Sequence, residues 1–234
     1  TSLSEIKRIK QAIAEGRLWE LLETRAHGHP ALFKALKRLG KHSEYMEENS
    51  PVVKGSGLFF FSSVGLIRPE IVRHRERLQH CLPPSETEVL VLLPQTRNKP
   101  FHKSREQQNL IKEIRRKLND KINRIQICTY AAPFGVVPME LDEVYPLSQY
   151  EVATPFDNEM KNYTAERVAD YIEATPHKKV ILLEDAENWG ETISKACKKI
   201  GRRKGIRTAV FHSESPWGKP TVENLVAAIE EAVE

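Results

Sequence analysis

Val89-Leu-Val-Leu-Leu93 is the stretch of sequence that decides the fold. An unbroken apolar run of this length is typical of a strand in a parallel sheet, because helices cover both faces of such a sheet. Three later segments share its strand character: residues 125–129, 180–183 and 208–211. A helical pattern follows each strand. This alternation predicts an α/β domain of three layers, with a four-stranded, mainly parallel sheet between helices.

Apolar residues at helical spacing mark the helices of this domain. The first helix is predicted to begin at Ser104, which makes a capping box with Gln107. The second helix is predicted to begin at Thr164, which has the side chain of a good N-cap. Before it we expect a long proline-rich loop that covers roughly residues 131–162.

Residues 1–80 have a different pattern, which predicts a mostly helical region with a short buried strand at residues 57–62. Two adjacent prolines, Pro83 and Pro84, then end any helix and favour an extended linker. We therefore expect a small, mostly helical domain over residues 1–81, a linker over residues 82–86, and the α/β domain over residues 87–234.

The composition is that of an ordinary globular chain, with 234 residues, of which 40% are hydrophobic and 29% charged. Its net charge of +4 excludes a histone-like polycation, and no apolar run is long enough to cross a bilayer. No signal peptide opens the chain, so we expect a cytoplasmic location and no membrane partner. The three cysteines lie far apart, which argues against a disulfide framework and a cysteine-rich zinc site. We predict neither a metal nor a cofactor.

Basic residues are concentrated in the first 81 residues, which hold 14 Lys or Arg against 9 Asp or Glu. The end of this region carries four arginines: Arg68, Arg73, Arg75 and Arg77. Because such a patch can neutralise phosphates, these are the predicted RNA-binding residues. A solvated protein surface is the alternative interpretation.

Ligands of parallel α/β sheets bind beyond the carboxyl ends of the strands. Polar loops follow all four predicted strands, and together they offer lysines, carboxylates, a histidine and aromatic rings to one pocket. Any α/β domain has polar loops at this edge, so position alone does not define a site. No Walker lysine loop, GxGxxG, HExxH or GxSxG motif is present.

Three segments carry a resemblance to a known family. Glu15-Gly-Arg-Leu-Trp-Glu-Leu-Leu-Glu23 with His29-Pro30, and then Leu66-Ile-Arg-Pro-Glu-Ile-Val-Arg-His74, resemble the region after the catalytic barrel of archaeal tRNA-guanine transglycosylases and archaeosine synthase. Gly135-Val-Val-Pro-Met-Glu-Leu-Asp-Glu-Val-Tyr-Pro-Leu-Ser-Gln-Tyr150 is similar to a distinctive segment of the synthase α/β domain. The resemblance implies a role in archaeosine biosynthesis, with tRNA and its 7-cyano-7-deazaguanine base as partners. In that family an amine donor is added to the nitrile of the base.

The sequence departs from the family in the motif after the first strand. The synthase motif has the form PCSxxKPYxxSxSH, and here Pro94, Lys99, Pro100 and Ser104 match it. Gln95, Phe101 and Gln107 replace its cysteine, tyrosine and histidine, so the thiol that could attack a nitrile is missing. The transglycosylase barrel and the PUA domain are also missing, and a partner protein could supply them. The chain starts at Thr1 without a methionine, which fits a split subunit, an excised fragment or a paralogue with a degenerate motif.

The resemblance also extends to the uracil-DNA glycosylase fold, in which a histidine motif after the last strand helps to hold an extruded base. His212-Ser-Glu-Ser-Pro216 lies at the matching place. A pocket for one extruded base would suit a protein that acts on a modified guanine. The predicted catalytic residues are Lys99, Glu140, Asp142 and His212, and the predicted substrate-binding residues are Pro94, Gln95, Thr96, Ser104, Phe134, Gly135, Glu143 and Asp185.

Three functions stay open at this point. The first is an archaeosine-synthase-like transferase, or a subunit of one, which acts on tRNA-linked deazaguanine. The second is a non-catalytic subunit that binds or docks RNA. The third is an enzyme for small molecules that is unrelated to RNA, which only the general α/β pattern supports.

Overall fold

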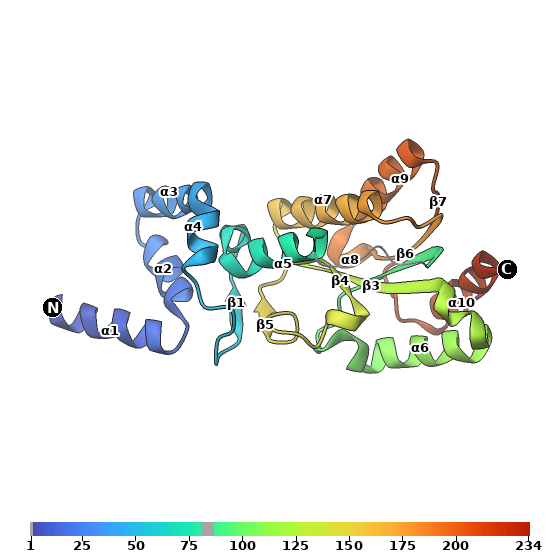
Figure 1. Ribbon diagram of the computed structural model, residues 1–234, viewed down its shortest axis with the longest axis horizontal. Coiled ribbons are helices and arrows are strands. Elements are labelled where there is room, and N and C mark those ends of the chain that lie inside the picture. Colours follow the sequence, from blue (N-terminus) through green and yellow to red (C-terminus); the bar gives the residue numbers. More distant parts are fainter. Residues whose placement is uncertain (1, 81–86) are drawn as a thin grey trace.

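A five-stranded sheet lies at the centre of the α/β region (Figure 1). The computed structural model describes residues 2–80 and 87–234, so the predicted linker lies outside the described residues. The strand order is β4-β3-β2-β6-β7. The strands are β2 (Val89–Pro94), β3 (Ile125–Ala131), β4 (Gly135–Pro138), β6 (Lys179–Asp185) and β7 (Arg207–Ser213).

The sheet has one strand more than the sequence predicts. β2, β3, β6 and β7 are parallel, and β4 pairs antiparallel with β3 at the edge. The prediction of an uninterrupted loop over residues 131–162 is therefore wrong at β4. Gly135 allows the tight return from β3, because its φ of +83° is one that side chains disfavour.

Helices cover both faces of the sheet. α7 (Asn158–Ala174) and α9 (Thr192–Lys204) pack on one face, and α6 (Arg105–Leu118) and α10 (Lys219–Val233) pack on the other. Figure 1 shows the two pairs on opposite sides of the strands. A short helix, α8 (Ala186–Trp189), follows β6. This arrangement is the predicted three-layer α/β architecture.

Two helix starts test the predicted caps. Ser104 caps α6 as predicted, and its hydroxyl accepts a hydrogen bond from the backbone N–H of Gln107. The predicted capping box is wrong in its second half, because the Gln107 side chain donates to the hydroxyl of Thr129 and Ser104 N donates to the carbonyl of Phe101. The start predicted at Thr164 is wrong, because Asp157 caps α7 and accepts a hydrogen bond from Met160 N at 2.7 Å. Thr164 instead lies inside the helix, where its hydroxyl donates to the carbonyl of Met160.

The first 80 residues form five helices and one strand within the part that the structure describes. These elements are α1 (Ser2–Ala14), α2 (Leu18–Ala26), α3 (Pro30–Arg38), α4 (Ser43–Glu48), β1 (Leu58–Phe60) and α5 (Pro69–His80). Five short 3₁₀ segments complete the described elements of the chain: Leu39–His42, Ser63–Ile67, Phe101–Lys103, Asn119–Arg124 and Met139–Leu141.

β1 connects the two parts of the chain. It pairs in parallel with β5 (Tyr150–Val152), which lies in the segment predicted as a loop. The aromatic rings of Phe60, Phe134 and Tyr150 meet edge to face beside this pair. A buried apolar cluster therefore contains residues from both sides of the predicted boundary.

Arg68 is fully buried at the base of the N-terminal helices. Its guanidinium donates to Glu20 at 2.9 Å, to Glu70 at 3.3 Å and to the carbonyl of Phe59 at 3.0 Å. Arg73 is also buried, and it bonds Glu47 and nearby backbone carbonyls. The structure therefore removes these two arginines from the predicted RNA-binding face, because both side chains are buried and bonded to carboxylates inside the protein.

Arg75 and Arg77 are the two predicted arginines that reach the surface, Arg75 in part and Arg77 fully.

Within residues 2–80 and 87–234, no helix has the length and apolar character that crossing a membrane requires.

Candidate functional site

A cavity of about 450 Å³ opens at the carboxyl edge of the sheet. Its walls come from the loop after β2, from the segment that begins with β5, and from α8 after β6. The lining residues are Gln95, Thr96, Arg97, Lys99, Glu151, Val152, Thr154, Phe156, Asp185, Asn188 and Trp189. The cavity therefore brings together four predicted residues: Gln95, Thr96, Lys99 and Asp185.

Two aromatic rings form the apolar part of the cavity wall. The ring centroids of Phe156 and Trp189 lie 4.9 Å apart, and Tyr130 packs edge-on against Trp189 at 5.3 Å. Trp189 and Tyr130 are almost fully buried in the core between α7, α9 and the sheet. Packing of this kind fixes the ring positions, so this wall is preformed.

Gln95 begins the loop after β2. Its backbone N–H continues the sheet by donating to the carbonyl of Tyr130, and its side-chain oxygen accepts from Ala132 N at 2.7 Å. The acceptor end of this amide is therefore occupied. Among the described residues nothing binds its Nε2 group, which leaves a donor for a ligand in the cavity.

Lys99 reaches the cavity over an aromatic surface. Its Nζ lies 4.3 Å from the centroid of Tyr150 and 5.8 Å from that of Phe101, so both rings stabilise the cation. Burial lowers the pKa of the Lys99 amine, and the carboxylate of Glu151 opposes this shift. Lys99 thus has a larger neutral, nucleophilic fraction than an exposed lysine at the same pH.

Asp185 is held by its neighbours. Its carboxylate caps α8 and bonds Asn188 twice, through the backbone N–H at 3.2 Å and through Nδ2 at 2.6 Å. Its own backbone N–H donates to the hydroxyl of Tyr130, which in turn donates to the carbonyl of Leu183. This network positions Asn188 and Asp185 at the cavity wall.

Asp142 lies outside the cavity and braces another loop. Its carboxylate accepts from the backbone N–H of His102 at 2.8 Å and lies 2.6 Å from Nδ1 of the same residue. Glu143 is exposed and pairs with Lys103 at 2.6 Å. Glu140 is also exposed, beside a groove along α6. These three predicted residues therefore do not line the cavity with Lys99.

His212 also lies outside the cavity lining, at the end of the edge strand β7. Its Nδ1 lies 3.1 Å from the buried carboxylate of Glu184. The other oxygen of Glu184 accepts from the backbone N–H of Ser194 at 2.8 Å. The pair therefore joins β7 to the start of α9.

The four remaining predicted substrate-binding residues support the fold and do not line the cavity. Pro94 is buried at the end of β2, Ser104 caps α6, and Phe134 belongs to the buried aromatic cluster. A Cβ on Gly135 would lie 2.4 Å from Cβ of Arg167, so only glycine fits where β4 passes α7.

The two described cysteines do not replace the missing thiol of the synthase motif. Cys128 and Cys197 are buried, and burial raises the pKa of both thiols. In the part of the chain that the structure describes, no group of three His, Cys, Asp or Glu side chains could hold a metal ion.

A family model described as "Domain of unknown function (DUF5591)" matches residues 71–229. The chain belongs to the DUF5591 family. It is also similar to proteins named tRNA-guanine(15) transglycosylase, so the predicted resemblance to archaeal transglycosylases is confirmed.

The similarity covers most of this DUF5591 chain but a minor part of each relative. Identity is 32% over 203 residues with the protein of Saccharolobus solfataricus, covering 86% of this chain and 37% of that one. It is 35% over 158 residues with the protein of Methanocaldococcus jannaschii, covering 68% of this chain and 22% of that one. A crystal structure of AF0587, a protein of unknown function, aligns with a TM-score of 0.49 at 19% identity over 67% of this chain and 49% of that one.

Sequence reasoning missed the cavity residues that β5 and α8 contribute to this DUF5591 chain. Phe156 and Glu151 enter the cavity because β5 pairs with β1, and no local periodicity indicates that pairing. Trp189 could have been found, because it lies six residues after the predicted strand end at Leu183, within the loop at the ligand-binding edge.

Proposed function

We propose that this chain binds tRNA that carries a 7-substituted deazaguanine and holds that base in the carboxyl-edge cavity. In this role it is a domain or subunit of archaeosine biosynthesis. The name of its relatives, tRNA-guanine(15) transglycosylase, supports tRNA as the partner and a guanine position as the target.

One observation carries the proposal: the cavity combines an aromatic wall with amide groups. Phe156 and Trp189 pack against each other and form one apolar wall, and proteins hold unstacked bases against aromatic side chains. Gln95 and Asn188 offer amide groups that can bond the edge of a base. The cavity volume of about 450 Å³ lies within the range of sites for small ligands.

The same residues argue against complete synthase chemistry by this chain alone. Glutamine is not a nucleophile, and the oxygen of Gln95 is already bonded to Ala132. The proposed role is therefore to bind and present the base, with the chemistry completed by another protein or another part of a longer chain.

A catalytic role through Lys99 is the second candidate. The lowered pKa of its amine favours the neutral form that could add to a nitrile carbon. In that step the new N–C bond forms, the π electrons of the nitrile move to its nitrogen, and a proton transfers from the amine to that nitrogen.

Two measurements separate these functions. Binding is measured with one tRNA transcript prepared either with guanine or with 7-cyano-7-deazaguanine at the target position. Preferential binding of the modified tRNA, reduced by Lys99→Met, supports the proposal. Equal binding of both tRNAs contradicts it.

Nucleoside mass spectrometry after incubation with candidate amines measures chemistry. Unchanged nitrile with the isolated chain is the expected result. Conversion that Lys99→Met abolishes would replace the binding role with the catalytic one. Lys103→Met is the matched control, because this nearby lysine is absent from the cavity lining.

A further inference from the structure

Helix α9 is the most basic helix of the α/β region. Its 13 residues contain six basic side chains and no acidic one: Lys195, Lys198, Lys199, Arg202, Arg203 and Lys204. Ile193, Cys197 and Ile200 of the same helix are buried against the sheet. The charged side chains therefore gather on the outward side of α9.

Three of these six charges are held by close partners in the protein. Lys195 pairs with Glu191, Arg203 pairs with Glu173, and Lys204 donates to backbone carbonyls at the end of α7. Within residues 2–80 and 87–234, the three others form no hydrogen bond or ion pair, and all three are exposed: Lys198, Lys199 and Arg202.

The stability of the helix does not account for this pattern. Basic residues in the last turn interact well with the helix dipole, which explains Arg202, Arg203 and Lys204. Lys195 lies in the first turn, where a positive charge is unfavourable, whereas Lys198 and Lys199 lie in the middle of the helix, where the dipole does not favour them. Like charges three and four residues apart also repel one another. The α7 carboxylates that border the same groove are already paired, Glu166 and Asp170 with Arg167 and Glu173 with Arg203. Lys198, Lys199 and Arg202 therefore remain available to an anion outside the protein.

The basic side of α9 begins at the cavity. Asn188 and Trp189 of α8 line the cavity, and α9 starts at Thr192. At a rise of about 1.5 Å per residue, α9 extends roughly 20 Å from there. A nucleic-acid strand with one base in the cavity could follow this helix with its backbone.

We propose that Lys198, Lys199 and Arg202 form a phosphate-binding track for the tRNA backbone next to the base in the cavity. The inference rests on the proposed function. It replaces the predicted RNA-binding patch at Arg68 and on α5, because Arg68 and Arg73 are buried. RNA is favoured over a lipid surface because α9 buries its apolar side in the sheet, whereas a membrane-binding helix inserts that side into the lipid.

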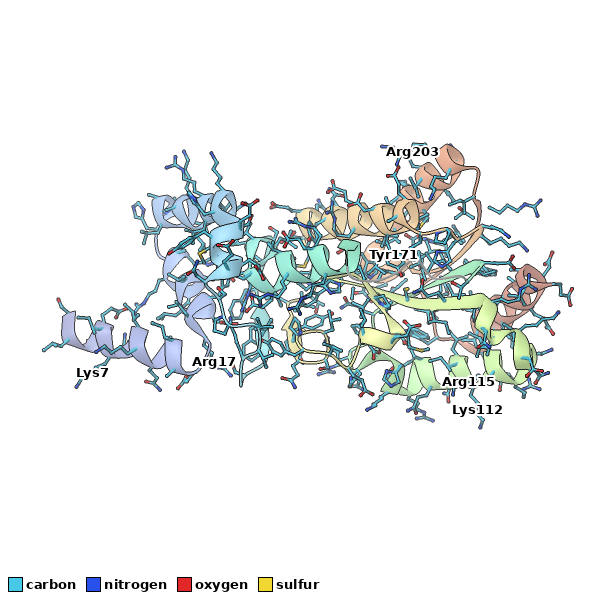
Figure 2. The ribbon with its side chains drawn as sticks, in the orientation of Figure 1. Lys7, Arg17, Lys112, Arg115, Tyr171 and Arg203 are labelled. Carbon is cyan, nitrogen blue, oxygen red and sulfur yellow. The ribbon has the colours of Figure 1, made fainter. Side chains whose placement is uncertain are left out.

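The test is salt-dependent binding of an unmodified, fluorescently labelled tRNA transcript to the full chain. The variant is the triple change Lys198→Gln, Lys199→Gln and Arg202→Gln. The matched control removes three unpaired charges from α6: Arg105→Gln, Lys112→Gln and Arg115→Gln. Figure 2 shows Arg203 of α9 and Lys112 and Arg115 of α6 on opposite sides of the molecule.

We expect the α9 triple variant to bind at least tenfold more weakly in 0.1 M KCl. The slope of log affinity against log salt should decrease in magnitude by about 2, because a complex with fewer phosphate contacts releases fewer counterions when it forms. The α6 triple variant should change affinity less than twofold. The melting temperature of the α9 variant should stay the same or rise, because repulsion within the helix is relieved.

Three results would overturn the track: unchanged affinity of the α9 variant, an equal loss in both triple variants, or binding of phosphatidylserine vesicles but not of tRNA. Because the transcript is unmodified, the measurement does not depend on recognition of deazaguanine. An α9 effect without any preference for the modified base would count against the proposed function and leave the track standing.

Discussion

The side-chain oxygen of Gln95 accepts a hydrogen bond of 2.7 Å from the backbone N–H of Ala132. This bond joins the loop after β2 to the turn between β3 and β4, and so fixes one wall of the cavity. The residue that takes the place of the synthase cysteine therefore has a structural partner.

Replacing Gln95 by alanine should lower the free energy of unfolding by about 1–3 kcal/mol, because the N–H of Ala132 then loses its acceptor. Gln95→Glu keeps an oxygen at this position and should lose less than half as much. Urea denaturation followed by tryptophan fluorescence measures both variants. Equal losses would show that the hydrogen bond contributes little.

Lys99 should react with an acylating reagent at lower pH than an ordinary lysine, since burial lowers the pKa of its amine. Peptide mass spectrometry of acetylation against pH gives the midpoint. Glu151→Gln removes the carboxylate that raises this pKa, so the midpoint should fall further. A midpoint at the ordinary lysine value of about 10.4 would contradict the proposed environment of Lys99.

Arg68→Met should destabilise the protein by about 3–5 kcal/mol, because it leaves the buried carboxylate of Glu20 without a cation and leaves Glu70 with Lys54 alone. Arg77→Met on α5 is the control, and loss of its exposed side chain should cost less than about 0.5 kcal/mol. Denaturant titration of both variants checks the difference. A small effect at Arg68 would mean that the carboxylates find other partners.

Stability should fall as the pH drops from about 6.5 to 4. Burial lowers the pKa of His74 to about 4, and its Nε2 bonds the carbonyl of Val136. In this window the unfolded chain binds a proton that the folded chain excludes, so unfolding is favoured as the pH falls. The contribution of His74 is on the order of 3 kcal/mol.

His74→Gln removes this titration, so its stability should depend less on pH between 4 and 6.5. His42→Gln, at an exposed position, should keep the dependence of the unchanged protein. Urea midpoints at several pH values decide the matter. Some dependence will persist in His74→Gln, because burial also lowers the pKa of His177 to about 4.

The strands predicted from sequence are those whose signal is local. β2 is an apolar run, as is the central part of β6 over residues 180–183, and helices on both faces of the sheet explain that pattern. β4 and β5 have four and three residues, and each is a strand only because of the strand it pairs with. Such pairing leaves no period in the sequence.

In the candidate site, too, only the residues with a local signal in the sequence could be predicted. Gln95, Lys99 and Asp185 follow strand ends, and the rule for parallel sheets places them together. The burial of Arg68 was not predictable, because its partner Glu20 lies 48 residues away on another helix. A run of arginines looks the same in sequence whether its charges face water or carboxylates.

Because β1 pairs with β5, the two parts of this protein should stay associated when the peptide chain between them is cut. Leu58 of β1 pairs with Tyr150 of β5, and Ser63 donates to the carboxylate of Asp157 at 3.0 Å. If a protease cut the peptide chain between residues 82 and 86, these contacts would hold the two fragments together. Residues 1–81 and 87–234 could then be produced as separate polypeptides and reconstitute one folded unit, as in split-protein complementation. Removing the first segment altogether would expose an unpaired strand edge and half of an aromatic cluster.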